Sequence, residues 1–274
     1  MDNIFFTCQF MGGLGNQLFQ AAHVLSQSYR FGVTSKFRSV SQTPNQGLQT
    51  SNYIKNIFKN LNFEENFTPS VRITESNWSF NILNPPLDSS CEFNGYFQSS
   101  KNFYGYQNKI KEIFSIGNTE EKYLKEKYPE LGDDNSVSLH VRRGDYSKFP
   151  LVHPIISKSY ITECLNQIEN ISKIFIFSDD KGWVNENLKL ENSIFVNEED
   201  YMELWMMSMC QNNILSNSSF SWWGGFLNKN KSKKVFVPSV WFGPNGPNNY
   251  IDIYESYHTI VKVNVIGNSL EYVT

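Results

Sequence analysis

The sequence lacks any long apolar run. No segment approaches the ~18 consecutive apolar residues that a membrane-spanning helix needs. Its beginning also lacks a basic segment followed by an apolar stretch, which is the pattern of a secretion signal. These absences predict a cytoplasmic protein without a membrane span or a signal peptide.

An excess of charge of one sign is also missing. The chain has 24 Lys and Arg against 27 Asp and Glu, which gives a formal net charge of −3. Nucleic acids and anionic membranes attract strongly basic surfaces, so neither is expected as a partner. The one basic run, residues 229–234, is typical of a solvated helix end.

Metal-binding patterns are absent from the sequence. Its four cysteines form no CxxC pair, its four histidines have no partner at ligand spacing, and no D-x-D motif occurs. The cysteines are therefore expected to be buried free thiols. No metal site and no bound cofactor are predicted.

The 274 residues include 40% hydrophobic and 15% aromatic side chains, which is enough for one large domain or two small ones. Residues 3–10 predict a buried strand. The following segment GGLGNQLFQAAHVLSQSY turns through glycines into a helix, because its apolar residues recur at helical spacing at Leu18, Phe19, Ala22 and Leu25. Residues 32–100 give no clear order of elements, and residues 101–128 carry two amphipathic helical patterns.

From residue 136 onward, apolar strands alternate with helical patterns. Strands are expected at 136–141, 173–177, 193–196, 213–216 and 234–237, the last closing the series. Helices are expected at 157–168, shortly after Asp180, at 200–210 and through Trp222. The 200–210 helix is apolar nearly all round, which predicts a buried helix. Such alternation implies right-handed crossovers and a parallel sheet, hence an α/β fold.

Three polar clusters directly follow three of these strands. They are Arg142, Arg143 and Asp145 in the run HVRRGDY, then Ser178, Asp179 and Asp180, and then Asn217 to Ser221. Ligands of open α/β sheets bind in the crevice outside the carboxyl ends of the strands, so all three clusters are expected to face one crevice.

The chemistry of the clusters suits a nucleoside diphosphate. Arg142 and Arg143 can each fork onto phosphate oxygens, and the helix start after Asn217 offers backbone N–H groups and the positive end of a helix dipole. Asp179 could accept hydrogen bonds from a ribose or a guanine edge. Taken singly, each cluster has a plainer reading: surface ion pairs, helix caps and, for the Trp222-Trp223 pair, core packing.

The N-terminal run GGLGNQ is a glycine turn between a strand and a helix. It is not a P-loop because no GK[ST] follows, and Leu18 stands where G-x-G-x-x-G requires its third glycine. Glycines still allow the backbone to approach a ligand closely. Asn16 would lie at the helix start, within reach of a phosphate or a sugar.

Four motifs in this order, GGLGNQLFQ, HVRRGDY, FSDD and NSSFSWWGGFLN, resemble those of the glycosyltransferase family 11 fucosyltransferases, the galactoside 2-α-L-fucosyltransferase group. The runs MCQNNILSN and KVFVPSVWF fit the same family. Residues 32–100 match poorly, which leaves the choice of acceptor open.

This resemblance implies a GT-B-like α/β fold of two Rossmann-like domains facing a donor and acceptor cleft. The expected domains are an acceptor-side domain over residues 1–132 and a nucleotide-sugar domain over 133–274. The family uses GDP-β-L-fucose as donor, inverts the anomeric carbon, needs no metal and transfers fucose to the 2-hydroxyl of a terminal β-galactoside. The donor-binding residues that it implies are Asn16, Arg142, Arg143, Asp179, Asn217, Ser218, Ser219 and Phe220.

The catalytic set expected from these motifs is Arg142, Asp145 and His140. Arg142 would stabilise charge on the departing diphosphate, and Asp145 is the candidate general base unless it orients Arg142 or His140 instead. His153 is a weaker candidate base.

Other functions fit parts of the pattern. A relative of the peptide O-fucosyltransferases would share the donor site, and a non-catalytic nucleotide-sugar or glycan-binding module would keep only the binding. An NAD-dependent oxidoreductase is disfavoured, because the third glycine and the expected acidic residue are missing. The sequence leaves the natural acceptor and the oligomeric state open.

Overall fold

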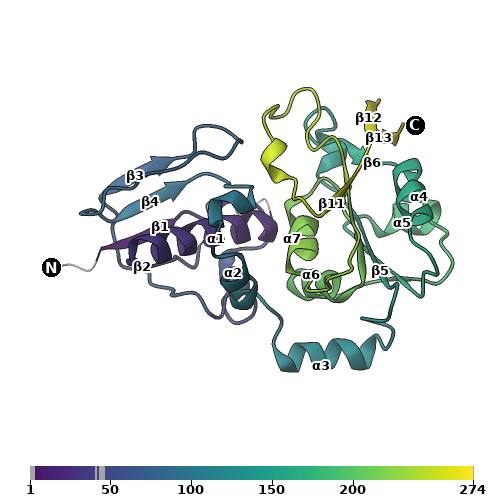
Figure 1. Ribbon diagram of the computed structural model, residues 1–274, viewed down its shortest axis with the longest axis horizontal. Helices are drawn as coiled ribbons and strands as arrows, with labels where there is room; N and C mark the ends of the chain where they lie inside the picture. The colour runs from purple at the N-terminus through teal and green to yellow at the C-terminus, as the bar shows by residue number, and fades with distance from the viewer. Residues whose placement is uncertain (1–3, 41, 43–46, 274) are drawn as a thin grey trace. The chain divides into compact units, whose positions relative to one another are not determined.

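The computed structural model describes residues 4–40, 42 and 47–273 (Figure 1). The chain forms two compact units. The first contains residues 1–115 and 249–255, and the second contains residues 116–248 and 256–274. The second unit therefore begins earlier than the expected boundary after residue 132, and a short late segment belongs to the first unit.

The first unit is built on a four-stranded parallel sheet with the order β2-β1-β4-β3. The strands are β1 Phe5–Cys8, β2 Thr34–Ser35, β3 Val71–Thr74 and β4 Cys91–Asn94. The predicted strand over residues 3–10 is confirmed at β1, which is buried throughout, while Asn3 lies outside the described residues.

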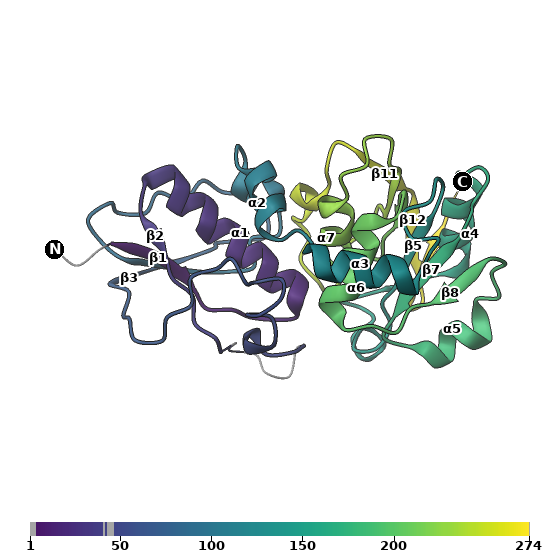
Figure 2. The same ribbon diagram turned by 90° about the horizontal axis from the view of Figure 1, so that it is seen from below.

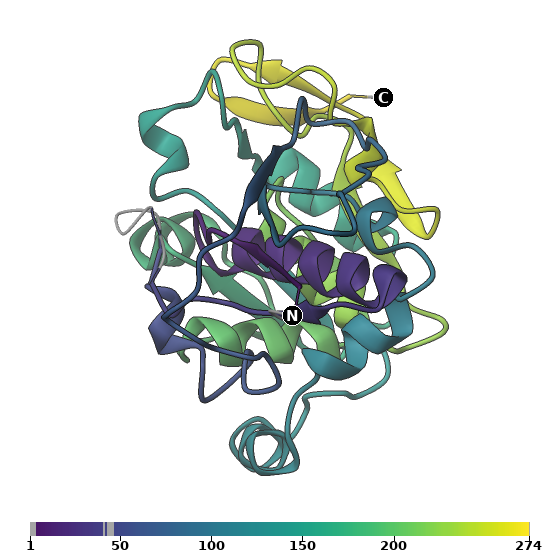
Figure 3. The same ribbon diagram turned by 90° about the vertical axis from the view of Figure 1, so that its left-hand side faces the viewer.

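Helix α1, Leu14–Phe31, runs alongside β1 (Figure 3). Its predicted apolar face is confirmed, since Leu18, Phe19, Ala22 and Leu25 are all buried. The helix follows Gly12, which adopts a φ of +74°, and a Cβ there would lie 2.3 Å from Asn16 Nδ2. Glycine is therefore required at this turn both by the backbone conformation and by the close approach.

The rest of the first unit consists of short elements joined by loops. They are η1 Thr50–Asn52, η2 Ser100–Phe103, α2 Gln107–Ile113 and η4 Ile251–Ile253. The late segment is fastened to the loop after β3, because Ser79 Oγ donates to the Asn249 carbonyl (2.9 Å) and Phe80 N donates to Asp252 Oδ2 (2.8 Å). Lys101 also forms an ion pair with Asp252.

The second unit is built on a six-stranded sheet with the order β11-β10-β9-β5-β7-β8, in which all the pairs are parallel. The strands are β5 Val137–Val141, β7 Ile174–Ser178, β8 Ser193–Phe195, β9 Asn212–Ile214, β10 Val235–Pro238 and β11 His258–Val261. The predicted parallel sheet is confirmed. The expectation that residues 234–237 close it is wrong, because β11 adds an edge strand.

Helices cover both faces of this sheet. They are α4 Lys158–Asn166, α5 Lys181–Asn187, α6 Asp200–Met209 and α7 Ser219–Leu227, with α3 Asn118–Lys127 preceding the sheet and η3 Tyr146–Lys148 following β5. Figures 1 and 2 both show α4 and α5 on one side of the sheet and α6 and α7 on the other. A small sheet of β6 Ile155–Ile156, β12 Val263–Ile266 and β13 Ser269–Tyr272 completes the unit.

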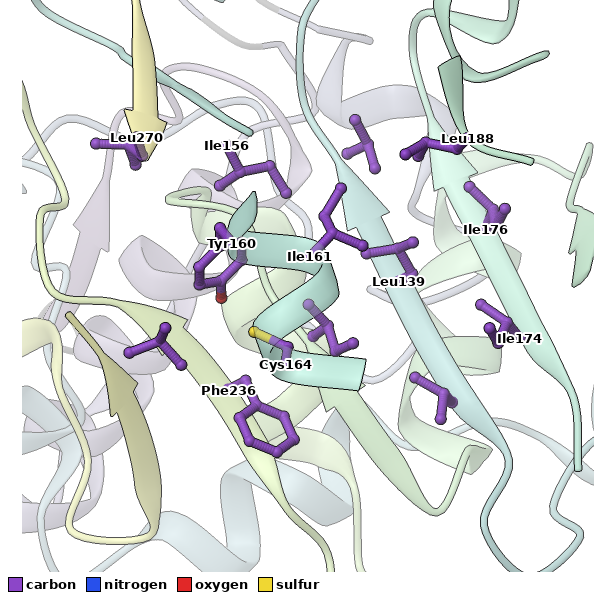
Figure 4. Packing of buried hydrophobic residues seen from close by; sticks show 14 of the residues in the cluster. Leu139, Ile156, Tyr160, Ile161, Cys164, Ile174, Ile176, Leu188, Phe236 and Leu270 are labelled. Carbon is purple, nitrogen blue, oxygen red and sulfur yellow. The ribbon is translucent and has the colours of Figure 1, made fainter. Parts of the chain in front are cut away.

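Apolar side chains fill both sides of the sheet. On one side, Ile161 of α4 points toward Leu139 of β5, and Cys164 and Phe236 belong to the same buried cluster (Figure 4). On the other, Trp205, Trp222 and Trp223 are fully buried. The plainer reading of the tryptophan pair, core packing, is thus confirmed, as is the buried state of the 200–210 helix.

All four cysteines are buried and free, as predicted. Within the described residues, no helix combines the length and the apolar character needed to cross a bilayer.

Candidate functional site

The three polar clusters lie at the carboxyl ends of three adjacent strands. Strand β5 pairs with β7 on one side and with β9 on the other. The chain reaches β7 and β8 on one side of β5 before it crosses to β9 and β10 on the other, so the strand order reverses beside β5. Such a switch point is where open α/β sheets bind ligands.

Arg142 is held by two carboxylates. Its Nε and Nη2 lie 3.0 and 2.8 Å from Asp145 Oδ1, and its Nη1 lies 3.1 Å from Asp179 Oδ2. The Arg142 side chain is 36% exposed, so the guanidinium is oriented by its partners and still open to solvent. An arginine in this state is suited to receive an anion.

Arg143 is fixed by different contacts. Its Nε lies 3.2 Å from Asp180 Oδ2, and its guanidinium lies 4.1 Å from the centre of the Trp183 ring. Its backbone N donates to Asp179 Oδ1 (2.8 Å). The two arginines thus share the Asp179 carboxylate, one through its side chain and one through its backbone.

Asp179 and Asp180 have separate structural tasks. Asp180 caps α5 by accepting from Trp183 N (2.9 Å), which confirms the helix-cap alternative for Asp180 alone. Asp179 joins the loop after β5 to the end of β7. The guanine or ribose contact expected of Asp179 stays a prediction.

The start of α7 forms the third cluster. Ser218 is the N-cap and accepts from Phe220 N (3.3 Å), as the capping alternative predicts. Ser219 and Phe220 occupy the first turn, where backbone N–H groups point out of a helix. Tyr146 OH donates to the Asn217 carbonyl (2.9 Å), which connects the loop after β5 to this helix start.

The Asn217 side chain is buried and connects two loops. It is 2% exposed, and its Nδ2 donates to the carbonyls of Pro154 (3.0 Å) and Trp241 (2.9 Å). Buried amide donors that hold two loop carbonyls fix backbone positions. Asn217 Nδ2 therefore positions these two loops, and the donor contact expected of Asn217 stays a prediction.

His140 lies inside the sheet, 5% exposed, on the same side as α7. Its Nδ1 lies 2.7 Å from Ser216 Oγ, and its ring lies against Phe220 (5.5 Å between centroids). Burial, aided by the Arg142 charge, lowers the pKa of His140 to about 3. The imidazole is therefore neutral at neutral pH. It is buried against Phe220 of α7 and does not lie at the exposed surface of the site.

The sequence predicts no role for Tyr146 and only a weaker candidate base at His153. The two rings stack at 4.6 Å, and His153 also contacts Phe242. Burial raises the pKa of Tyr146 to about 12 and lowers the pKa of His153. The signal for Tyr146 was present, because it ends the HVRRGDY run, whereas nothing in the sequence marked Trp183 as the ring that covers Arg143.

Asn16 lies in the first turn of α1 in the first unit, and its Oδ1 accepts from Gln98 Nε2 (2.7 Å). The residues of the three clusters all belong to the second unit. A donor contact by Asn16 stays a prediction.

Among the described residues, no three His, Cys, Asp or Glu side chains are grouped to hold a metal ion. Metal independence also stays a prediction, because it concerns the reaction.

Solved structures with a similar fold include a fucosyltransferase and a protein crystallised with GDP-fucose. A crystal structure of the fucosyltransferase NodZ from Bradyrhizobium matches with a TM-score of 0.53 and 12% identity over 83% of this chain and 94% of that chain. POFUT1 in complex with GDP-fucose matches with a TM-score of 0.51 and 12% identity over 85% and 97%. The protein thus has a GT-B-like α/β fold, the class of many glycosyltransferases.

The family model described as Glycosyl transferase family 11 matches residues 3–241, and the chain belongs to this family. An alpha-1,2-colitosyltransferase of Escherichia coli is 28% identical over 92% of this chain and 97% of that protein. The O-antigen biosynthesis glycosyltransferase WbnK of Escherichia coli is 36% identical over 40% of each chain. The protein is a glycosyltransferase, as the four motifs predicted.

Proposed function

We propose that this glycosyltransferase moves L-fucose from GDP-β-L-fucose to the 2-hydroxyl of a terminal β-galactoside, with inversion and without a metal. The observation that carries the proposal is the Arg142 guanidinium, oriented by Asp145 and Asp179 at a switch point beside the start of α7. An arginine and a helix N-terminus are the two groups that a departing diphosphate needs when no cation neutralises it.

The charges of the site indicate how the donor enters. Two arginines face three aspartates, so the cluster is not positive before a ligand binds. We infer that an incoming diphosphate takes the place of a carboxylate on Arg142. Asp145 is the carboxylate to yield, because its side chain is 56% exposed, against 26% for Asp179.

This exchange gives Asp145 its role in the reaction. Once the phosphate oxygens hold Arg142, the Asp145 carboxylate is released and can accept the proton of the acceptor hydroxyl. The acceptor oxygen forms a bond to the anomeric carbon, the bond from that carbon to the β-phosphate oxygen breaks, and GDP leaves with the electron pair. Attack opposite the leaving group inverts the anomeric carbon.

The comparisons support the donor class. POFUT1 has been crystallised with GDP-fucose and NodZ with GDP, and both share this fold with TM-scores of 0.51 and 0.52. NodZ is an α-1,6-fucosyltransferase, so the fold is compatible with more than one linkage. The α-1,2 linkage is supported by the family and by the colitosyltransferase.

A second candidate donor is a GDP-linked colitose, which the relative that covers 92% of this chain favours. Colitose is fucose without its 3-hydroxyl. A site that hydrogen-bonds this hydroxyl rejects the deoxy sugar strongly, whereas an apolar site discriminates weakly. The ratio of kcat/KM for the two donors decides between them.

The test offers GDP-fucose and GDP-colitose to a panel of β-galactosides, lactose included, with and without EDTA. Products are identified by mass spectrometry and their linkage by NMR. The proposal expects an α-1,2-fucosylated galactoside whose formation is insensitive to EDTA. If colitose is transferred in preference to fucose, the proposed donor is wrong. If a peptide accepts the sugar, the proposed acceptor is wrong. GDP binding without transfer or donor hydrolysis would favour the non-catalytic module.

A further inference from the structure

Two aromatic rings stack at the carboxyl edge of the first unit's sheet. Trp78 follows β3 and Tyr96 follows β4, and these strands are neighbours. Their ring centroids lie 5.3 Å apart with an interplanar angle of 15°. Both side chains are half-buried. We refer to this pair as the Trp78–Tyr96 platform.

A carboxylate fixes the backbone under the platform. Glu75 Oε2 accepts from Tyr96 N (2.8 Å) and from Phe97 N (3.1 Å). Phe97 adopts a φ of +53°, a strained conformation for a bulky residue, and a Cβ at Gly95 would lie 2.5 Å from Glu75 Cβ. Such strain persists only where the surroundings enforce it, and it concentrates at ligand sites.

The platform is connected to the glycine turn. Gln98 Nε2 donates to Asn16 Oδ1 (2.7 Å), which joins the segment after β4 to the helix that follows the neighbouring strand β1. A hydrogen bond thus links the segments that follow β1 and β4, and the ring stack links those that follow β4 and β3. The carboxyl edge of a parallel sheet is where ligands bind in this fold class.

The chemistry of the platform and Glu75 selects an uncharged sugar. The faces that the two rings turn to each other are occupied, so the C–H face of a pyranose ring would stack on an outer ring face, while the polar ends of such rings stay hydrated. A carboxylate accepts hydrogen bonds from sugar hydroxyls through lone pairs that two backbone N–H groups do not exhaust. The same carboxylate repels a diphosphate. Burial raises the pKa of Glu75, although both backbone N–H groups favour its charged form.

We propose that the Trp78–Tyr96 platform, with Glu75 beside it, binds a pyranose ring of the acceptor glycan. This inference rests on the proposed function, because it names the residues that hold the acceptor of that reaction. It assigns the recognition of a neutral hexoside to the loops after β3 and β4, within residues 32–100, where no order of elements could be predicted.

The kinetic test measures the KM for acceptor and for donor separately in Trp78→Ala and Trp78→Phe. Loss of the stacked ring is expected to raise the acceptor KM by about three- to tenfold, with the donor KM unchanged within about twofold. Trp78→Phe, which keeps an aromatic face, is expected to retain most of the affinity. The control is Tyr104→Ala, which removes a ring that is 74% exposed in the same unit. An unchanged acceptor KM in Trp78→Ala, or an equal rise in both KM values, would overturn the proposal.

A binding test separates this inference from the proposed function. Saturation-transfer NMR measures binding of neutral β-galactosides to the full chain without donor, and calorimetry measures GDP binding on the same samples. Glycan binding that Trp78→Ala abolishes supports the platform even if no transfer is found. No saturation transfer to any neutral glycoside overturns it, whatever the GDP result. If Trp78→Ala does not fold, Tyr96→Leu removes an aromatic face with a smaller loss of volume and makes the same test.

Discussion

At the scale of single residues, the site depends on how Arg142 is shared between two carboxylates. Asp145 and Arg142 are three residues apart on one loop, whereas Asp179 belongs to the end of the neighbouring strand. Asp179 is thus the fixed partner and Asp145 the exposed one. Substitution of each group has a different expected result.

Arg142→Ala removes the charge that is expected to stabilise the departing diphosphate. Groups with this role contribute about 3–4 kcal/mol to the transition state, so kcat is expected to fall by about 10² to 10³. Arg142→Lys is expected to recover little, because an ammonium lacks the planar fork. Steady-state kinetics and thermal unfolding are the measurements, with Arg30→Ala, exposed at the end of α1, as the control. Near wild-type kcat in Arg142→Ala would remove this residue from the site.

Asp145→Asn separates catalysis from donor binding. Loss of a general base lowers turnover by about 10² to 10⁴. GDP is expected to bind at least as tightly, because the diphosphate no longer competes with a carboxylate for Arg142. Calorimetric titration with GDP and single-turnover kinetics check both halves of this expectation. Weaker GDP binding with unchanged turnover would show that Asp145 only orients Arg142.

At the scale of elements, the loop after β5 is packed tightly against the end of β7. A Cβ on Gly144 would lie 2.5 Å from Asp179 Oδ2. The Asp179 carboxylate holds both Arg142 Nη1 and Arg143 N, so displacing it disturbs the two arginines together. The glycine of the run HVRRGDY is therefore required by a side-chain contact, and not by an unusual backbone angle.

Gly144→Ala is expected to lower kcat/KM by about tenfold or more, because small displacements of positioning groups are costly in catalysis. Its free energy of unfolding is expected to change little, because the contact lies at the edge of the sheet. Gly182→Ala on α5 is the matched control, since the nearest atom to its new Cβ is 3.7 Å away. Equal kinetics for both variants would show that the loop adapts.

The site could be placed from the sequence at the level of elements, because each cluster directly follows an apolar strand and parallel strands end at one edge. The partners of individual side chains could not be. Asn217 has a residue type that suits a ligand contact, but no local pattern predicts that its Nδ2 donates to the carbonyls of Pro154 and Trp241, which are distant in sequence. The Trp78–Tyr96 platform was missed because β3 and β4 are four residues long and lie between loops without periodicity.

At the scale of the whole molecule, buried neutral histidines couple stability to pH. Burial lowers the pKa of His23, His140 and His258 to about 3. Their unfolded forms bind a proton below about pH 6.5, whereas the folded forms do not, so each contribution to stability is complete above that pH and is lost as the pH falls. Burial raises the pKa of Glu203 to about 8, which acts in the opposite direction.

As the pH is lowered, the free energy of unfolding is therefore expected to decrease less steeply in His140→Asn than in the unmodified protein. The difference between the two is expected to reach about 1.4 kcal/mol for each pH unit between about pH 6 and about pH 4. Urea unfolding at several pH values measures this difference. The contribution of Glu203 to it cancels, because both proteins contain this residue. Parallel pH profiles would show that His140 is protonated in the folded state.

The order in which the chain is synthesised gives the late segment a further consequence. Residues 249–255 complete the first unit, yet they leave the ribosome after the second unit's strands β5 to β10. Domains usually fold in the order of synthesis. Here the loop after β3 lacks its partner until Asp252 emerges. The second unit is completed later still, because β11, β12 and β13 follow residue 255. Translation through residues 116–248 thus sets how long the nascent first unit lacks the contacts of Ser79, Phe80 and Lys101 with the late segment.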